Sequence, residues 1–238
     1  MRRPYWIPPH ASPYDFPPLE SALEHPDGLL AIGGDLTPNR LIVAYRQGIF
    51  PWYSDDQPIL WWSPSQRMVL FPECLKVSRS LRKILNKNKF VVTLDQNFRQ
   101  VIQECAGSRR NQHGTWITEE MQEAYCQLHQ YGFAHSIESW YEERLVGGLY
   151  GVSLGKVFFG ESMFSRMSDA SKVAFVHFVW QLQRWNYELI DCQVHTNHLQ
   201  SLGAFEIPRQ QYRALLDRLC DVPGHTRAWQ FDNHERDS

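Results

Sequence analysis

The sequence predicts an α+β protein in two parts, a small N-terminal α/β domain (residues 1–65) and a larger C-terminal domain (residues 66–238). A length of 238 residues accommodates one large or two small domains. Helical and strand-like patterns are mixed along the chain, and a run of consecutive alternating segments begins only after residue 132. Hydrophobic residues make up 43% and charged residues 21%, as in an ordinary globular protein.

The N-terminal part contains one clear helix. Residues 1–32 are rich in proline and aromatic residues and predict an irregular, packed segment. Thr37 fits the N-cap and Pro38 the first position of a helix, which Gly48 ends. A loop and then a strand are expected at 52–66 and 67–71.

The C-terminal part is expected to contain a β-meander followed by a long helix. Between residues 133 and 164, apolar and polar residues alternate and glycine or acidic turns interrupt them, which predicts three antiparallel strands. A long helix follows over 168–186, with Ala174, Phe175, Phe178 and Leu182 on its buried face. The other expected elements are helices at 77–88, 96–106, 117–132, 197–205 and 208–220 and strands at 89–95 and 188–196.

This order of C-terminal elements is similar to that of acetyltransferase-like (GNAT) acyltransferases. In that plan the acyl donor and the acceptor amine meet where two central strands splay apart, although element order alone says little about chemistry. Enzymes of this plan bind the pyrophosphate of coenzyme A with a glycine-bearing loop before the long helix. Here the loop reads SRMSDASK and has no glycine, which argues against a coenzyme A donor.

Composition excludes several classes of protein. No apolar run approaches the ~20 residues of a membrane span, and the N-terminus lacks the apolar core of a signal peptide. Five scattered cysteines favour a reducing cytoplasm over a disulfide framework or a zinc site. The net charge is −2, so any RNA contact requires a local basic patch. We expect no metal, because His195 and His198 lack a third ligand, and no cofactor.

Three polar residues near the ends of two predicted central strands form the main candidate site. Glu161 follows an apolar strand, whereas Asp191 and Gln193 are two residues apart and would point to the same face of another. If the strands are neighbours, the three side chains converge and can hold a cationic amine and help it lose a proton. The alternative is that Glu161 faces water at a strand end and that Asp191 and Gln193 bind backbone groups.

Apolar residues around Glu161 can wall a pocket for a medium-sized apolar side chain. The same residue types equally suit an ordinary hydrophobic core. The residues are Leu149, Phe158, Met163, Phe175, Phe178 and Ile190.

Two further patterns favour contact with RNA. Trp52, Trp61 and Trp62 lie with Tyr53 in a predicted loop, where aromatic rings can stack on a nucleobase or pin the N-terminal domain onto its neighbour. The helix at 77–88 carries a basic stripe with no acid to balance it, which favours a phosphate-binding patch over an ordinary solvated face. The stripe comprises Arg79, Arg82, Lys83 and Lys87.

Several longer motifs together resemble those of the leucyl/phenylalanyl-tRNA–protein transferases. They are PDGLLAIGGDLTPNRLIVAYRQGIFPWY, ILWWSPSQRMVLFPE, GTWITEEMQEAY, HSIESW, LVGGLYGVSLGKVFFGESMFSRMSDASKVA and LIDCQVHTNHLQSLGAFEIPR. The motifs span roughly residues 26 to 212. Each motif alone is weak, but together they are specific to this family.

The resemblance implies an enzyme that moves Leu or Phe, with Met as a further candidate, from an aminoacyl-tRNA to the N-terminal Arg or Lys of a protein. The new peptide bond would mark that protein for degradation by the N-end rule. We expect a cytoplasmic monomer that uses no membrane. An acetyl-CoA-dependent N-acetyltransferase and a non-catalytic RNA-binding module are the alternative predictions.

The resemblance also implies roles for individual residues. Glu161 of GESMFSR would bind the α-amino group of the aminoacyl moiety, and Asp191 and Gln193 of DCQV would act at the reacting amine. The terminal adenosine of the tRNA would be held by Trp52 of FPWY and Trp116 of GTWIT, with Tyr45 and Tyr125 nearby.

Overall fold

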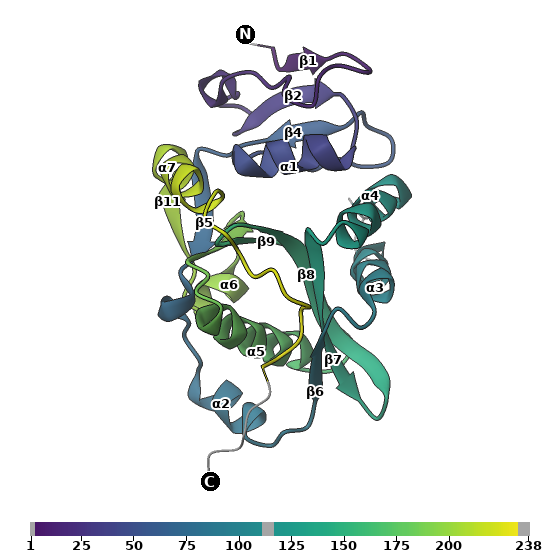
Figure 1. Ribbon diagram of the computed structural model, residues 1–238, viewed down its shortest axis with the longest axis vertical. Helices are drawn as coiled ribbons and strands as arrows, with labels where there is room; N and C mark the ends of the chain where they lie inside the picture. Colours follow the sequence, from purple (N-terminus) through teal and green to yellow (C-terminus); the bar gives the residue numbers. More distant parts are fainter. Residues whose placement is uncertain (1–2, 111–116, 233–238) are drawn as a thin grey trace.

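The computed structural model describes residues 3–110 and 117–232, which form two β-sheets and the helices around them (Figure 1). The first sheet contains N-terminal strands in the order β1-β2-β4-β3. The second has seven strands in the order β11-β5-β10-β9-β8-β7-β6. The strands are β1 (Tyr5–Ile7), β2 (Leu29–Gly33), β3 (Phe50–Pro51), β4 (Leu60–Trp62), β5 (Gln66–Leu70), β6 (Val91–Leu94), β7 (Ala134–Tyr141), β8 (Arg144–Leu154), β9 (Val157–Ser165), β10 (Leu189–Gln193) and β11 (Phe205–Pro208).

Helices cover both faces of the second sheet, so this part of the chain has a layered arrangement of helices and strands. Adjacent residues of a strand point to opposite faces. In β9, Phe159 packs into the core cluster that contains α3 and α4, whereas Phe158 packs into the cluster that contains α5. The helices are α1 (Pro38–Arg46), α2 (Arg79–Leu85), α3 (Phe98–Arg110), α4 (Glu119–Gln130), α5 (Ala170–Arg184), α6 (Asn197–Ser201) and α7 (Arg209–Leu219), with 3₁₀ turns at Leu19–Ser21 and Pro72–Cys74.

The N-terminal segment is more regular than the sequence predicts. It contains β1 and β2, so the expectation of an irregular segment over residues 1–32 is wrong at these strands. The expected loop over 52–66 is likewise wrong at β4, which contains Trp61 and Trp62. The first three residues of β2 are all buried, so the strand lacks the alternating pattern of a half-exposed strand. Helix α1 begins at Pro38 as predicted, but the Thr37 hydroxyl donates a hydrogen bond to Asp35 instead of capping the helix.

The C-terminal part follows the predicted order closely. Strands β7, β8 and β9 form the antiparallel meander, and α5 and β10 follow. Thr118 caps α4 by accepting a hydrogen bond from the backbone N–H of Met121. The sequence pattern does not predict β11, a short strand that pairs with β5.

Strands β9 and β10 separate partway along their length. They pair in parallel only from Leu189 to Asp191 of β10, whereas β9 continues to Ser165. On its other side β10 pairs with β5, and the register shifts between Asp191 and Gln193. Such a bulge redirects the chain. The edge of β9 beyond Phe159 is therefore left open toward the end of β10.

The cysteines form no disulfide among the described residues, and three of them are buried: Cys105, Cys126 and Cys220. Burial is the main cause that raises the pKa of Cys220 to about 12. In the part of the chain that the structure describes, no helix has both the length and the apolar character needed to cross a membrane.

Candidate active site

A cavity of about 280 Å³ opens where β9 and β10 separate. Its wall is mainly apolar with a few polar groups, which is the usual composition of small-molecule sites. The polar groups come from distant parts of the chain: Glu161 and Ser162 belong to β9, Gln193 to β10 and His198 to α6. The splayed strands thus bring together the two segments that the sequence analysis singled out.

Three side chains donate hydrogen bonds to the carboxylate of Glu161, which is only 7% exposed. Tyr45 Oη and Gln193 Nε2 each donate to Oε1 over 2.7 Å. Tyr125 Oη donates to Oε2 over 2.9 Å, and the two tyrosine hydroxyls also contact each other. Among the described residues, Oε2 receives only this one hydrogen bond, so it can accept another from a cationic ligand.

Burial raises the pKa of Glu161 to about 7, against the opposing effect of the Tyr45 and Tyr125 hydroxyls. The negative charge of Asp191 raises the pKa further. Burial also raises the pKa values of Tyr45 and Tyr125 well above 10, so both hydroxyls stay protonated and remain donors. A carboxyl group in a cavity with a pKa near 7 is a typical feature of functional sites.

Asp191 borders the cavity but is fully buried, and it pairs with a buried arginine. Arg67 donates from Nε and Nη2 to the two carboxylate oxygens over 2.8 and 2.7 Å. The Tyr212 hydroxyl and the backbone N–H of Gln193 each donate over 2.9 Å. Four donors occupy this carboxylate, and the expected role of Asp191 at the reacting amine stays a prediction.

Arg67 is the main polar residue that the sequence analysis missed. It is 1% exposed, and its guanidinium carbon lies 4.6 Å from the Phe50 ring centroid and 4.8 Å from the Tyr212 ring centroid. Burial alone would lower the pKa of Arg67, but the charge of Asp191 raises it overall. The only sequence signal was a charged residue directly before the apolar run 68–70 of β5.

Asp191 and Gln193 both line the cavity, but their side chains contact different neighbours of β10. Asp191 contacts Arg67 of β5, whereas Gln193 contacts Glu161 of β9 on the other side of β10. Gln193 has a φ of +61°, and the bulge precedes it, so the alternation of a regular strand does not apply. Its side chain thereby reaches the cavity.

The apolar wall agrees largely with the predicted pocket. Phe178 is the exception: it is fully buried behind the wall, and its ring packs edge-on against Phe158 at a centroid distance of 4.6 Å. The hypothesis that Phe178 lines the pocket is therefore wrong, because α5 presents the neighbouring turn to the cavity. The predicted residues that do line it are Leu149, Phe158, Met163, Phe175 and Ile190.

The predicted adenosine-binding aromatics divide into two groups. Trp52 lines the cavity and is 45% exposed, so its ring is accessible to a ligand. Tyr45 and Tyr125 are fully buried, and their hydroxyls donate to Glu161; their expected place near the adenosine stays a prediction. Trp61 is a core residue whose indole N–H donates to the Gly33 carbonyl. Trp116 lies outside the described residues.

The basic stripe lies on the exposed side of α2 and the turn that follows it. Arg79, Arg82 and Lys83 belong to the helix, and Lys87 comes just after it. All four side chains are exposed, and none of the salt bridges found among the described residues involves them. Leu81 and Leu85 turn inward. The stripe is thus an accessible cationic surface that is separate from the cavity lining.

One group of potential metal ligands occurs within the described ranges, at Asp95, His129 and His135, whose ligand atoms lie within 4.8 Å of one another. The Nδ1 atom of His135 contacts the Asp95 carboxylate over 2.7 Å, and that of His129 contacts the Ala134 carbonyl over 2.8 Å. These hydrogen bonds join α4 to β7 and explain why the three side chains lie close together without a metal ion.

Similarity to known proteins covers most of the chain. A family model described as leucyl/phenylalanyl-tRNA protein transferase matches residues 69–217, and the model of its N-terminal domain matches residues 34–65. The leucyl/phenylalanyl-tRNA–protein transferase of Nitrosospira multiformis is 59% identical over 92% of this chain and 95% of its own. That of Nitrosomonas europaea is 60% identical over 91% of this chain and 92% of its own.

Solved structures offer only distant similarity. A GCN5-related N-acetyltransferase-like protein from Streptococcus suis is 16% identical, with a TM-score of 0.32 over 60% of this chain and 59% of that chain. A similarity of this size supports no conclusion about the present chain. The relationship to known proteins rests on the sequence matches.

Proposed function

Because the chain belongs to the leucyl/phenylalanyl-tRNA protein transferase family, we propose that its cavity binds the aminoacyl end of a tRNA that carries Leu or Phe. The chain is an enzyme that transfers an amino acid from aminoacyl-tRNA to a protein. The acceptors in this proposal are proteins with N-terminal Arg or Lys. The observation that carries the proposal is a buried carboxylate, held by two tyrosines, beside an apolar cavity.

The donor amino acid presents two unlike groups within a few bonds of each other, a cationic α-ammonium and an apolar side chain. The α-ammonium binds Oε2 of Glu161, which has room for a further donor, and the side chain enters the wall formed by Leu149, Phe158 and Met163. A bound ammonium stabilises the ionised form of Glu161 and so lowers its pKa. This pairing explains why an acid lies in the middle of the apolar strand β9.

The reaction is aminolysis of an ester. The acceptor amine attacks the carbonyl carbon of the aminoacyl ester, a C–N bond forms, and the C–O bond to the ribose breaks. The proton that the amine loses is matched by the one that the leaving ribose oxygen gains. Since the ester is already activated, correct placement supplies most of the rate enhancement.

Gln193 positions the acceptor amine in this proposal. Its Nε2 is held by Glu161, which leaves the Oε1 of the amide to accept a hydrogen bond from the amine. Asp191 acts through Gln193, because its carboxylate accepts a hydrogen bond from the Gln193 backbone N–H. We therefore describe Asp191 and Arg67 as positioning residues.

The tRNA contacts are proposed from exposure and charge. Trp52 stacks on the terminal adenine, since its exposed ring borders the cavity. The basic stripe on α2 binds backbone phosphates, which need charge rather than base identity. Trp116 retains the adenosine role that the family motif implies.

Three broader statements complete the proposal. Residues 66–238 form a GNAT-like domain after an N-terminal domain of residues 1–65; the meander, α5 and the splayed β10 support this reading. The enzyme acts in the cytoplasm, where aminoacyl-tRNA is made, on proteins destined for N-end rule degradation. It acts as a monomer in this proposal.

A transfer assay tests the proposal. A peptide that begins with Arg is incubated with labelled Leu-tRNA or with labelled acetyl-CoA, and a peptide that begins with Glu serves as the control acceptor. We expect label from Leu-tRNA on the Arg peptide alone, and its loss after ribonuclease treatment. Transfer only from acetyl-CoA, or RNA binding without transfer, would contradict the proposal.

A further inference from the structure

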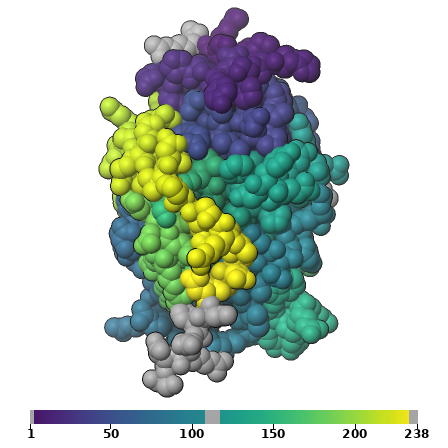
Figure 2. Space-filling view, viewed as in Figure 1, coloured from purple at the N-terminus to yellow at the C-terminus, as the bar shows by residue number. Residues whose placement is uncertain are grey.

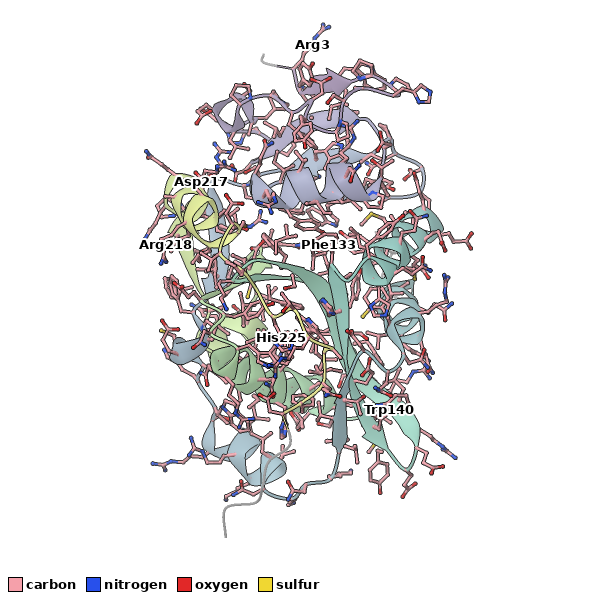
Figure 3. The ribbon with its side chains drawn as sticks, in the orientation of Figure 1. Arg3, Phe133, Trp140, Asp217, Arg218 and His225 are labelled. Carbon is pink, nitrogen blue, oxygen red and sulfur yellow. The ribbon has the colours of Figure 1, made fainter. Side chains whose placement is uncertain are left out.

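The last described residues form a C-terminal segment (residues 221–232) that crosses the outside of the second domain. Figure 2 shows it as a yellow band on the surface, between the parts of the molecule that carry α5 and α4. Figure 3 labels His225 within it. The segment follows residue 217, where the family match ends.

Contacts on both sides of Trp229 hold the segment against α5. Before it, the His225 ring stacks on the ring of Trp185 at a centroid distance of 3.8 Å. After it, Asp232 accepts a hydrogen bond from Gln181 Nε2 over 2.6 Å and returns one from its backbone N–H over 3.2 Å. Gln181 itself is fully buried. The segment is therefore anchored at two points that flank one tryptophan.

Trp229 is the buried anchor of the segment, at 7% exposure. Its indole stacks on the His135 ring at 3.5 Å with an interplanar angle of 2°. It also contacts Phe158 and Phe178, at centroid distances of 6.2 and 5.9 Å. Phe158 lines the cavity beside Glu161. Trp229 thus lies directly behind a wall of the proposed donor pocket.

The Phe158 ring has little room to move in any other direction. On the β8 side it lies against Gly151, where an added Cβ would come within 2.6 Å of the ring. On the α5 side, Phe178 packs edge-on against it. The indole of Trp229 closes the remaining side of this aromatic cluster. Close packing of this kind means that a change behind the wall alters the depth of the pocket.

We propose that Trp229 is a specificity-determining positioning residue: it holds Phe158 forward and thereby sets how large a donor side chain the cavity accepts. This inference rests on the proposed function of the cavity. Removing the indole lets the Phe158 ring retreat, so the pocket deepens and favours the larger side chain of Phe over that of Leu.

The test compares kcat/KM for Phe-tRNA and Leu-tRNA in full-length variants. Trp229→Ala should raise the ratio of Phe to Leu use by about tenfold, the size of effect that a small change in an apolar pocket produces. Trp229→Phe keeps a ring in place and should restore the ratio to within about twofold of the wild-type value. Phe231→Ala is the matched control, because Phe231 contacts His177 and lines a different cavity.

A second measurement does not depend on the folding of Trp229→Ala. The protein is labelled with 5-fluorotryptophan, and the resonance that is missing from Trp229→Phe is assigned to Trp229. We expect this ¹⁹F resonance to shift when a phenylalanyl-adenosine analogue is added and to stay in place when adenosine alone is added. If the Trp229 resonance keeps the same chemical shift with either ligand, the inference is wrong.

The kinetic outcomes separate this inference from the proposed function. Equal losses for both donors in Trp229→Ala, or the same change of ratio in Phe231→Ala, would show that the segment only supports the fold. If the wild-type protein transfers neither amino acid, the proposed function itself fails.

Discussion

The side-chain amide of Gln193 donates a hydrogen bond to the carboxylate of Glu161 over 2.7 Å, across the gap where β9 and β10 separate. This contact joins the two splayed strands through their functional side chains. It fixes the Gln193 amide in one orientation, with its Nε2 on Glu161. The group proposed to hold the donor thereby also orients the group proposed to hold the acceptor.

Shortening Gln193 should slow transfer without disturbing the backbone. Gln193→Asn suits the test, because asparagine tolerates the left-handed φ of +61° at this position. The shorter amide no longer reaches Glu161, so the single-turnover rate with both substrates saturating should fall by about tenfold or more. Gln200→Asn, on the exposed side of α6, serves as the control. An unchanged rate in Gln193→Asn would remove Gln193 from the proposed role.

Breaking the buried pair of Asp191 and Arg67 should destabilise the protein strongly. Asp191→Asn leaves the buried Arg67 charge without its partner, which costs about 3–5 kcal/mol in the free energy of unfolding. Urea unfolding measures this change. Asp221→Asn should have almost no effect, since its pair with Arg46 is exposed. If both variants lose equally little unfolding free energy, the stabilising role assigned to the pair of Asp191 and Arg67 is wrong.

Removing charge from α2 should weaken the use of every aminoacyl-tRNA alike. The double variant Arg79→Ala with Lys83→Ala should raise the KM for Leu-tRNA and Phe-tRNA equally. It should also lower the salt dependence of binding, by a slope of about 0.7–0.9 for each phosphate that the protein no longer neutralises. An aminoacyl-adenosine donor, which lacks the tRNA stem, should react as before.

The matched control for α2 is the double variant Arg213→Ala with Arg218→Ala on α7, which removes the same charge elsewhere. It should leave the KM values near wild type. If the α2 variant also loses activity on aminoacyl-adenosine, the stripe supports the fold instead of binding RNA.

Stability should depend on pH through Glu161. The folded protein holds the Glu161 proton up to a pKa of about 7, whereas an unperturbed carboxyl releases it near 4.5. Between these values the folded state binds more protons, so stability falls as pH rises, by roughly 3 kcal/mol in total. Glu161→Gln removes this loss. Urea unfolding is measured at pH 5 and pH 8, and the variant should gain stability relative to wild type at the higher pH. If the difference in unfolding free energy between variant and wild type is the same at both pH values, the raised pKa of Glu161 is wrong.

The sequence predicts most of the second sheet and of α5 because these elements carry local signals. The alternation between residues 133 and 164 and the apolar face of α5 correspond to β7, β8, β9 and α5. The sequence analysis missed β1, β2, β3, β4 and β11, because short strands that pair with distant segments leave no local period. Their formation depends on contacts that a window of sequence does not contain.

The sequence predicted most of the residues that line the candidate site, but not the hydrogen bonds among them. Glu161, Gln193 and most of the apolar wall lie at the cavity, as their positions on the two strands suggested. The bulge before Gln193 and the partner Arg67 decide which group Asp191 contacts, and neither follows from a two-residue spacing. The burial of Tyr45 and Tyr125 likewise depends on α1 and α4 meeting at β9.

The central claim is that the Glu161 carboxylate binds the α-ammonium of the donor, and steady-state transfer by Glu161→Gln tests it most directly. Kinetics of wild type and variant are measured with Leu-tRNA, Phe-tRNA and an acceptor peptide that begins with Arg. A neutral amide binds ammonium less well, so the KM for both donors should rise by about ten- to a hundredfold. The KM for the acceptor and the circular dichroism of the folded protein should stay near wild type. Wild-type kinetics for both donors in Glu161→Gln would contradict the account.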